Sequence, residues 1–237
     1  MGLKRANIIG VFGFFITTTS MAHASEVYGV FEVGHAAGRF YDAEVTIPSS
    51  TTTSSAVVDD TDHSLFAAIG IGYYWESKPL RTEIVYRKLG SQEFVEDTVF
   101  TSSLNERTTV NVEQESLMIN LLYDFENNSD LIPYVGFGIG GSRAKISAMQ
   151  YDYPLTDRFA SFAESSDTNF AWNFVVGTNY NVFEKMAIGL GYRFISAGKV
   201  STADNCIGSD LAICDENEKH SADLKLHSLF LNVNYQF

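Results

Sequence analysis

The amino-acid sequence predicts an all-β fold, an eight-stranded antiparallel up-and-down transmembrane β-barrel, and three observations support this prediction. Apolar residues recur at every second position in eight segments, as one face of a β-strand requires. The connections between these segments alternate between short and long. The opposite faces of the segments carry glycine, asparagine and charged residues, which suit a polar lumen better than a dry core.

The clearest segment is the last one, residues 224–237. Polar residues mostly separate its apolar positions, which are Leu229, Leu231, Val233, Tyr235 and Phe237. A transmembrane barrel turns an apolar face to lipid and a polar face to its lumen, with aromatic residues at both rims. A final strand with a terminal aromatic residue on its apolar face fits this arrangement.

The first residues have the features of a secretory signal peptide. Lys4 and Arg5 precede a short apolar run at residues 8–16, and residues 22–24 form an A-x-A cleavage pattern. The run is too short for a transmembrane helix, which needs about 20 residues. We expect residues 1–24 to be a cleaved signal peptide and residues 25–237 to form one exported barrel domain.

Charge and cysteine content narrow the classes of partner. Without Lys4 and Arg5, 14 basic residues face 29 acidic ones, a net charge of −15. Such a surface argues against nucleic acid as a partner. Cys206 and Cys214 are the only cysteines in the sequence, and a close pair in an exported chain suggests a disulfide that staples a loop.

The first two expected strands are residues 27–34 and 65–75. In the first, valine, glycine and phenylalanine share one face; in the second, leucine, isoleucine, tyrosine and tryptophan alternate with phenylalanine and glycine. Between them, residues 35–62 contain the polar run SSTTTSS and are expected to be a long exposed loop. Residues 76–79 end in proline and predict a tight turn.

The third expected strand, residues 80–89, fixes the register of the barrel. Arg81, Glu83 and Arg87 share one face, while the opposite face is mainly apolar. A shift by one residue would place these charges in hydrocarbon, at a cost of about 2–4 kcal/mol for each arginine near the bilayer midplane. Residues 90–114 are expected to be a second long loop.

Five further strands are expected along the rest of the chain. Residues 115–125 and 132–140 flank a short turn at 126–130, and the second of these strands sets Val135, Phe137 and Ile139 against glycines. A third long loop is expected at 142–168. Alternation then marks residues 170–180 and 186–195, which flank a turn at 181–185; a fourth loop at 196–223 precedes the final strand.

The lengths of the connections predict the orientation of the barrel. Long connections follow the first, third, fifth and seventh strands, and short ones follow the second, fourth and sixth. Outer-membrane barrels have short periplasmic turns and long extracellular loops. Both chain ends should therefore lie on the periplasmic side. A soluble lipocalin-like barrel or sandwich is the alternative, but it would need large apolar residues in its interior.

Three stretches resemble the small eight-stranded outer-membrane barrels of the OmpA-like, surface-antigen type. They are PYVGFGIG at 133–140, GYRF at 191–194 and NVNYQF at 232–237. The resemblance implies residence in the bacterial outer membrane and an extracellular face active in adhesion, immune exposure or envelope integrity. It supplies no catalytic residues. It also implies that the barrel assembly machinery recognises the C-terminal strand.

Six charged residues have inward parity and are the candidate lumen network: Glu32, Arg81, Glu83, Arg87, Asp124 and Arg193. An eight-stranded barrel is just wide enough for side chains to fill its interior. Because unpaired buried charges are costly, we expect these groups to form a salt-bridge and hydrogen-bond network that plugs the lumen. The alternative is a narrow pore in which the pairs rearrange.

Neither an enzyme site nor a metal site is expected. His63 and Ser64, and likewise His227 and Ser228, are adjacent in strands and so point to opposite faces, whereas nucleophilic catalysis needs them in contact. The acidic run at residues 59–62 lacks the spacing of an EF-hand loop. We expect no cofactor.

The leading functional hypothesis is a surface-exposed structural or adhesin-type antigen with long extracellular loops. A narrow passive pore is the first alternative, and a lipid-modifying outer-membrane enzyme is the second. The expected partners are outer-membrane lipid and lipopolysaccharide, the barrel assembly machinery, and a host or matrix ligand. The barrel is expected to be a monomer.

Overall fold

The computed structural model describes residues 26–47, 52–55, 61–76, 78–101, 104–125, 129–153, 159–204, 206–208 and 219–237. Within these ranges the chain forms strands β1 (Val27–Ile47), β2 (Thr52–Ser55), β3 (Thr61–Tyr74), β4 (Leu80–Leu89), β5 (Gln92–Thr101), β6 (Leu104–Asp124), β7 (Leu131–Tyr153), β8 (Phe159–Phe183), β9 (Met186–Ser201), β10 (Cys206–Gly208) and β11 (Lys219–Gln236). Across the described ranges, no helix is long and apolar enough to cross a bilayer.

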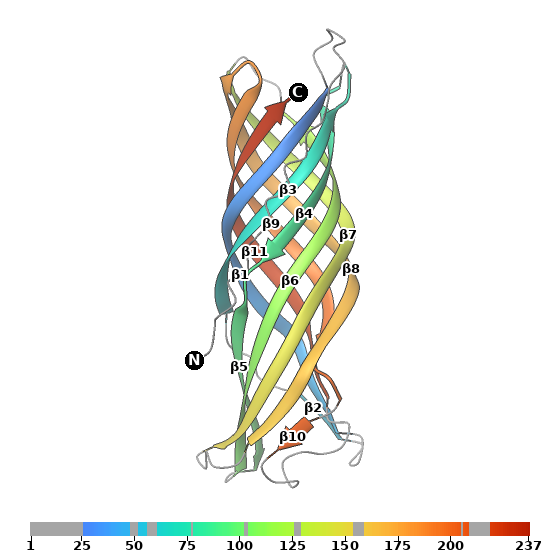
Figure 1. The fold of residues 1–237 in the computed structure, drawn as a ribbon, viewed down its shortest axis with the longest axis vertical. Coiled ribbons are helices and arrows are strands. Elements are labelled where there is room, and N and C mark those ends of the chain that lie inside the picture. Colours follow the sequence, from blue (N-terminus) through green and yellow to red (C-terminus); the bar gives the residue numbers. More distant parts are fainter. Residues whose placement is uncertain are drawn as a thin grey trace, which may run out of the picture.

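Eight of these strands form a closed ring (Figure 1). Each pairs antiparallel with the next in the order β1, β3, β4, β6, β7, β8, β9 and β11, and β11 pairs back to β1. The short strands β2, β5 and β10 pair onto β1, β6 and β8. The predicted fold class, an eight-stranded antiparallel up-and-down barrel, is confirmed.

The apolar face of the predicted register points outward. Ile71, Phe137 and Leu231 are 48%, 52% and 60% exposed, whereas Arg81 and Glu83 are 1% and 3% exposed. Most of the exposed large apolar residues form a belt around the end of the barrel that carries the short turns and the C-terminus, which is at the top of Figure 1. Met149, Phe159 and Ile207 lie beyond this belt. We call the part of the barrel that carries the belt the membrane half.

The strands continue far beyond this belt, which corrects the prediction of four long loops. β6, β7 and β8 contain 21, 23 and 25 residues. Most of the segment 142–168 is therefore strand, with β7 running to Tyr153 and β8 starting at Phe159. Most of the segment 90–114 is a hairpin of β5 with β6. β1 likewise runs to Ile47, and β11 already starts at Lys219.

The amphipathic pattern of the strands inverts where they leave the belt. In β6 the outward residues change from Leu117 and Ile119 to Glu113 and Asn111, while Val112 and Val110 are 1% and 6% exposed and face inward. We call the part beyond the belt the extracellular half, because extended connections of outer-membrane barrels face outward from the cell. Its interior is an apolar core that includes Phe40, Phe94, Val112, Ile146, Phe162 and Leu224.

The ring opens at two seams in the extracellular half. The pairing of β8 with β9 reaches Trp172 opposite Ser196, and beyond it Asp167 accepts a hydrogen bond from the backbone N–H of Ser201 at 2.6 Å. Between β3 and β5, Asp62 accepts one from the N–H of Glu93, also at 2.6 Å. Two sheets, one centred on β7 and the other on β11, thus face each other across the apolar core.

Candidate functional site

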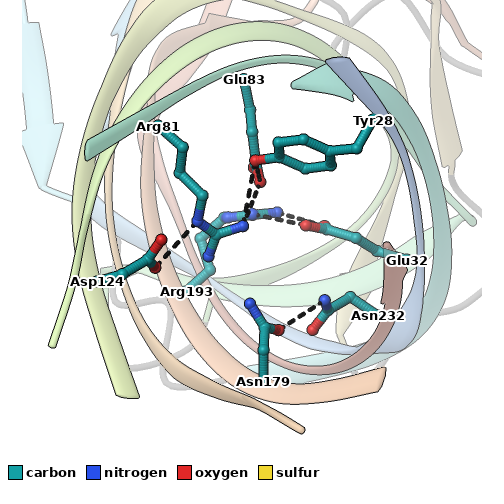
Figure 2. Close-up of polar contacts among 8 residues, drawn as sticks. All are labelled: Tyr28, Glu32, Arg81, Glu83, Asp124, Asn179, Arg193 and Asn232. Carbon is teal, nitrogen blue, oxygen red and sulfur yellow. Dashed lines mark hydrogen bonds and ion pairs between the residues drawn. The ribbon is translucent and has the colours of Figure 1, made fainter. Parts of the chain in front are cut away.

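The lumen of the membrane half holds a network of ion pairs centred on Arg81. Its guanidinium lies 2.8 Å from Glu83 and 3.1 Å from Asp124. Tyr28 donates a hydrogen bond to Glu83 at 2.8 Å and accepts one from Arg81 at 3.2 Å. Figure 2 shows these side chains converging inside the ring from β1, β4 and β6. Arg81 therefore connects three strands through charge-assisted hydrogen bonds.

A second ion pair joins the first strand to the seventh strand of the ring. Arg193 of β9 donates two hydrogen bonds to Glu32 of β1, at 2.6 and 2.8 Å (Figure 2). The guanidinium also lies 4.7 Å from the centroid of the Phe230 ring. Both partners are almost completely buried, at 3% and 2% exposure. A bidentate geometry of this kind gives the buried pair the orientation that it needs to offset desolvation.

Amide side chains bridge other strands inside the barrel. Asn173 donates to Asn120 at 2.8 Å, and Asn232 donates to Asn179 at 3.0 Å. Closer to the extracellular half, Gln114 donates to Ser142 at 2.9 Å, near the level at which the interior becomes apolar. The two asparagine pairs each reach across one intervening strand, over Gly138 and Gly189, and the glutamine–serine pair joins neighbouring strands.

Arg87 is the exception in this network. Its guanidinium donates to Ser228 at 2.6 Å and lies 3.6 Å from the centroid of the Phe66 ring. Among the described residues its Nε and Nη1 atoms have no hydrogen-bond partner, although the residue is only 2% exposed. The sequence predicted its inward position but not its separation from a carboxylate.

The glycine stripes make room for the aromatic residues of the lumen. A Cβ atom at Gly72 would collide with the ring of Tyr28, and one at Gly191 would collide with the ring of Phe230. Because Gly72 lies directly opposite Tyr28 in the pairing of β1 with β3, the ring can lie across that strand. Close packing of this kind fills the interior of a narrow barrel.

All six residues of the predicted lumen network have buried side chains in the structure. The structure connects Arg81 with Glu83 and Asp124, connects Arg193 with Glu32, and leaves Arg87 apart. Sequence reasoning missed Tyr28, Tyr134, Ser228 and Phe230 as contacts of the arginines. The alternation in the sequence places these residues on the inward face of their strands. An aromatic residue in a barrel strand can, however, equally belong to a rim.

The two adjacent histidine–serine pairs, which the sequence analysis did not expect to be enzyme sites, have separate contacts in the structure. Ser228 accepts its hydrogen bond from Arg87 inside the barrel, while His227 on the outside contacts the hydroxyl of Tyr192 at 2.6 Å. His63 stacks on His35 with ring centroids 5.0 Å apart, and the hydroxyl of Ser64 bonds to the backbone of Leu65. In the described ranges, neither serine is bonded to a histidine, and no group of three or more potential metal ligands occurs.

Several further predictions lie at or beyond the limits of the described chain. Residues 1–24, Asp59, Asp60 and Cys214 are outside it, and Cys206 begins β10. The signal peptide and the disulfide stay predictions. The apolar residues of the C-terminal strand all face outward, and their recognition by the assembly machinery stays a prediction: Leu229, Leu231, Val233, Tyr235 and Phe237 are 62%, 60%, 38%, 51% and 43% exposed.

Comparison with known proteins identifies relatives of the same architecture. The family described as outer membrane protein beta-barrel domain matches residues 13–237. Outer membrane protein PagN of Salmonella typhimurium is 31% identical over 128 residues, which cover 53% of this chain and 51% of PagN. The match thus spans about half the length of that relative.

Two solved structures share the fold. Neisserial surface protein A has 16% identity and a TM-score of 0.50, with 90% of this chain and 98% of the other covered. The outer membrane protein OprG from Pseudomonas aeruginosa has 11% identity and a TM-score of 0.54, again with 90% and 98% covered.

Proposed function

The chain belongs to the outer membrane protein beta-barrel family of Gram-negative bacteria, and from this premise we propose that it is a surface-exposed interaction protein of the adhesin type. The extracellular half would present the binding surface, and the membrane half would anchor it. In this proposal the protein is a monomer, is inserted by the barrel assembly machinery and binds a host or matrix ligand.

The observation that carries the proposal is the folded extension beyond the lipid belt. The part of β6 that precedes Ser116 extends about 40 Å along the strand, at about 3.3 Å per residue. Phe94 and Phe162 are 0% and 2% exposed inside it, so the interior of the extension is packed with apolar side chains. A preorganised surface loses less entropy on binding than flexible loops do, which favours recognition of a large ligand.

The filled lumen supports an interaction role over a passive pore. Ion pairs of Glu32, Arg81 and Arg193 lie inside the lumen of the membrane half, and the ring centroids of Phe40 and Phe94 are 4.3 Å apart in the extracellular half. A conducting pore would require both layers to move. The separation of the serine and histidine side chains likewise supports a function without catalysis.

The test is adhesion by cells that display the full chain. The first variant joins Phe94 to Val110, which lie directly opposite each other, through a short turn, and so removes the tip of one hairpin. The control variant replaces the short turn at residues 126–130. We expect the trimmed variant to lose binding to cultured host cells and immobilised matrix proteins, while the control binds like the wild type.

Both variants must retain heat-modifiable mobility on a detergent gel, which reports a folded barrel. If trimming each of the extracellular hairpins in turn left adhesion unchanged, the proposal would be wrong. A large and steady conductance of the wild-type protein in planar bilayers would favour the pore instead.

A further inference from the structure

A polar cleft lies on the outside of the barrel at the edge of the apolar belt. It has a volume of about 250 Å³ and is lined by Lys88 of β4, by Glu113, Gln114 and Glu115 of β6, and by Arg143 and Lys145 of β7. Leu117, the next outward residue of β6 after Glu115, already belongs to the belt and is 54% exposed. The cleft therefore lies at the level of the lipid headgroups, and we call it the interface cleft.

The row of charges next to the belt has an excess of one cation. Lys88 and Arg143 lie directly opposite Glu115, on its two sides. Glu115 is 3.9 Å from the guanidinium of Arg143, and it accepts a hydrogen bond from the hydroxyl of Tyr86 at 2.7 Å. Within the described ranges the side chain of Lys88 makes no ion pair or hydrogen bond, and on its other side it is opposite Ala67. Two cations and one carboxylate give this row a net charge of +1.

The next row, one step farther from the membrane, has an excess of one carboxylate. Glu113 is directly opposite Lys145, but the ammonium of Lys145 lies 3.6 Å from Glu164 of β8. In the part of the chain that the structure describes, Glu113 has no ion pair. One step farther still, the residue opposite Asn111 is another exposed acid, Glu93. Two carboxylates and one cation give the row of Glu113 a net charge of −1.

The ion pairs within the cleft leave its cations accessible. The side chains of Arg143 and Lys145 are 50% and 44% exposed, and that of Glu164 is 65% exposed. Exposed pairs of this kind contribute little to stability, because water screens them. A charged ligand can therefore displace water from these groups at low cost.

The belt has a glycine between two large side chains directly next to the cleft. Leu117, Gly141 and Phe170 lie opposite one another on β6, β7 and β8. Phe170 is 67% exposed, and Leu117 is likewise an exposed residue of the belt. A Cβ atom at Gly141 would have only the carbonyl oxygen of Asn169 nearby, at 4.0 Å. An acyl chain can therefore pack against the backbone at Gly141, between the two side chains.

We propose that the interface cleft binds a lipid whose headgroup is phosphoethanolamine. The phosphate, which is next to the acyl chains, would lie between Lys88 and Arg143 and form charge-assisted hydrogen bonds with both. The primary ammonium, which is farther from the acyl chains, would lie at Glu113. The two rows of the cleft, positive next to the belt and negative beyond it, thus match the order of charges in this headgroup.

The test measures lipid binding by the full chain folded in a non-ionic detergent, using isothermal titration. The probes are phosphatidylethanolamine, phosphatidylglycerol and phosphatidylcholine with the same acyl chains, and water-soluble phosphoethanolamine. We expect the wild type to bind phosphatidylethanolamine about threefold to fivefold more tightly than the other two lipids. Glycerol carries no charge for Glu113, and choline has no N–H group to donate to it.

Two variants test the two rows separately. Glu113→Gln should remove the preference, so that the three lipids bind alike. Lys88→Gln should weaken the binding of all three lipids by about threefold to fivefold and leave the preference in place. The matched controls are Glu44→Gln and Lys199→Gln, which make the same charge changes at an exposed ion pair of 3.2 Å between β1 and β9. Each control should bind every lipid within about twofold of the wild type.

Equal binding of the three lipids by the wild type would overturn the proposal, as would a preference that survives in Glu113→Gln or is lost equally in Glu44→Gln. If water-soluble phosphoethanolamine bound as tightly as the lipid, the assignment to a lipid would be wrong. Heat-modifiable mobility verifies that each variant is folded. None of these outcomes depends on adhesion to host cells, because the ligand belongs to the membrane around the barrel.

Discussion

The membrane half and the extracellular half of the barrel use the same strands with opposite amphipathic patterns. In the first, Leu117 and Ile119 face outward, and Arg81 and Asn120 fill the interior. In the second, Asn111 and Glu113 face outward, and Val112 and Ile146 are buried. Alternation persists through both halves, because every strand has two faces. The outward face is apolar where lipid surrounds the strands and polar where water does. The pattern therefore inverts where the surroundings change from lipid to water.

The largest effect is expected from a cavity in the core of the extracellular half. Phe94→Ala removes a fully buried ring whose centroid lies 4.3 Å from the centroid of the Phe40 ring. Substitutions of this kind cost about 3–5 kcal/mol. If the two halves have separate cores, strands beyond the belt should become sensitive to protease while the barrel stays heat-modifiable. Loss of both properties together would mean that the halves fold as one unit.

The next effect compares two outward positions of one strand. Ile119→Arg places a charge in the lipid belt and should lower the free energy of unfolding in lipid vesicles by about 2–4 kcal/mol. Asn111→Arg, on the same face of β6 but past the point of inversion, should change it by no more than about 0.5 kcal/mol. Urea titrations of both variants measure the difference. Similar costs at both positions would show that the inversion does not mark the membrane boundary.

A smaller effect is expected at the seam between β3 and β5. Asp62→Ala removes the carboxylate that accepts the N–H of Glu93 at 2.6 Å. A hydrogen bond to a charged group contributes about 1.5–3 kcal/mol to stability. Because Asp62 is partly exposed, we expect the loss of stability to lie at the low end of this range. Hydrogen exchange at Glu93 should accelerate, while exchange at Ile119 within the membrane half should not change. Faster exchange at both residues would contradict a local role for the seam.

The smallest effect is expected inside the lumen at Arg87. Arg87→Met replaces a buried guanidinium without a carboxylate partner by an apolar side chain of similar length. Such replacements are often neutral or stabilising, so we expect the free energy of unfolding to change by no more than about 1 kcal/mol. Glu32→Ala is the comparison, because it leaves Arg193 buried and unpaired and should cost about 3–5 kcal/mol. A large loss from Arg87→Met would indicate a further partner for its Nε and Nη1 atoms.

The sequence predicted the membrane half well because, along each of its strands, the alternate apolar residues face outward to lipid. The expected strand 80–89 coincides with β4, since a shift of its charges into lipid would be too costly. The expected strand 115–125 covers only the second part of β6, because Val110 and Val112 alternate in the opposite sense to Leu117 and Ile119. The sequence contains this second pattern, but a prediction that places apolar residues outward along the whole strand misses it.

The sequence predicted which residues belong to the candidate network but not which of them form ion pairs with one another. Inward parity identifies Arg81, Arg87 and Arg193, yet the carboxylate that each one meets depends on the tilt and stagger of the strands. Arg193 meets Glu32 across the intervening strand β11, and Arg87 meets Ser228 instead of an acid. The room that Gly72 and Gly191 leave for Tyr28 and Phe230 likewise follows from three-dimensional register.

The pair formed by Glu32 and Arg193 has a consequence for biogenesis. One partner belongs to the first ring strand to be synthesised and the other to the final hairpin, 161 positions later in the chain. Contacts between such distant positions form only after the intervening chain is ordered. The carboxylate and the guanidinium therefore stay hydrated until the barrel closes. Their ion pair stabilises the barrel only at this last step of folding.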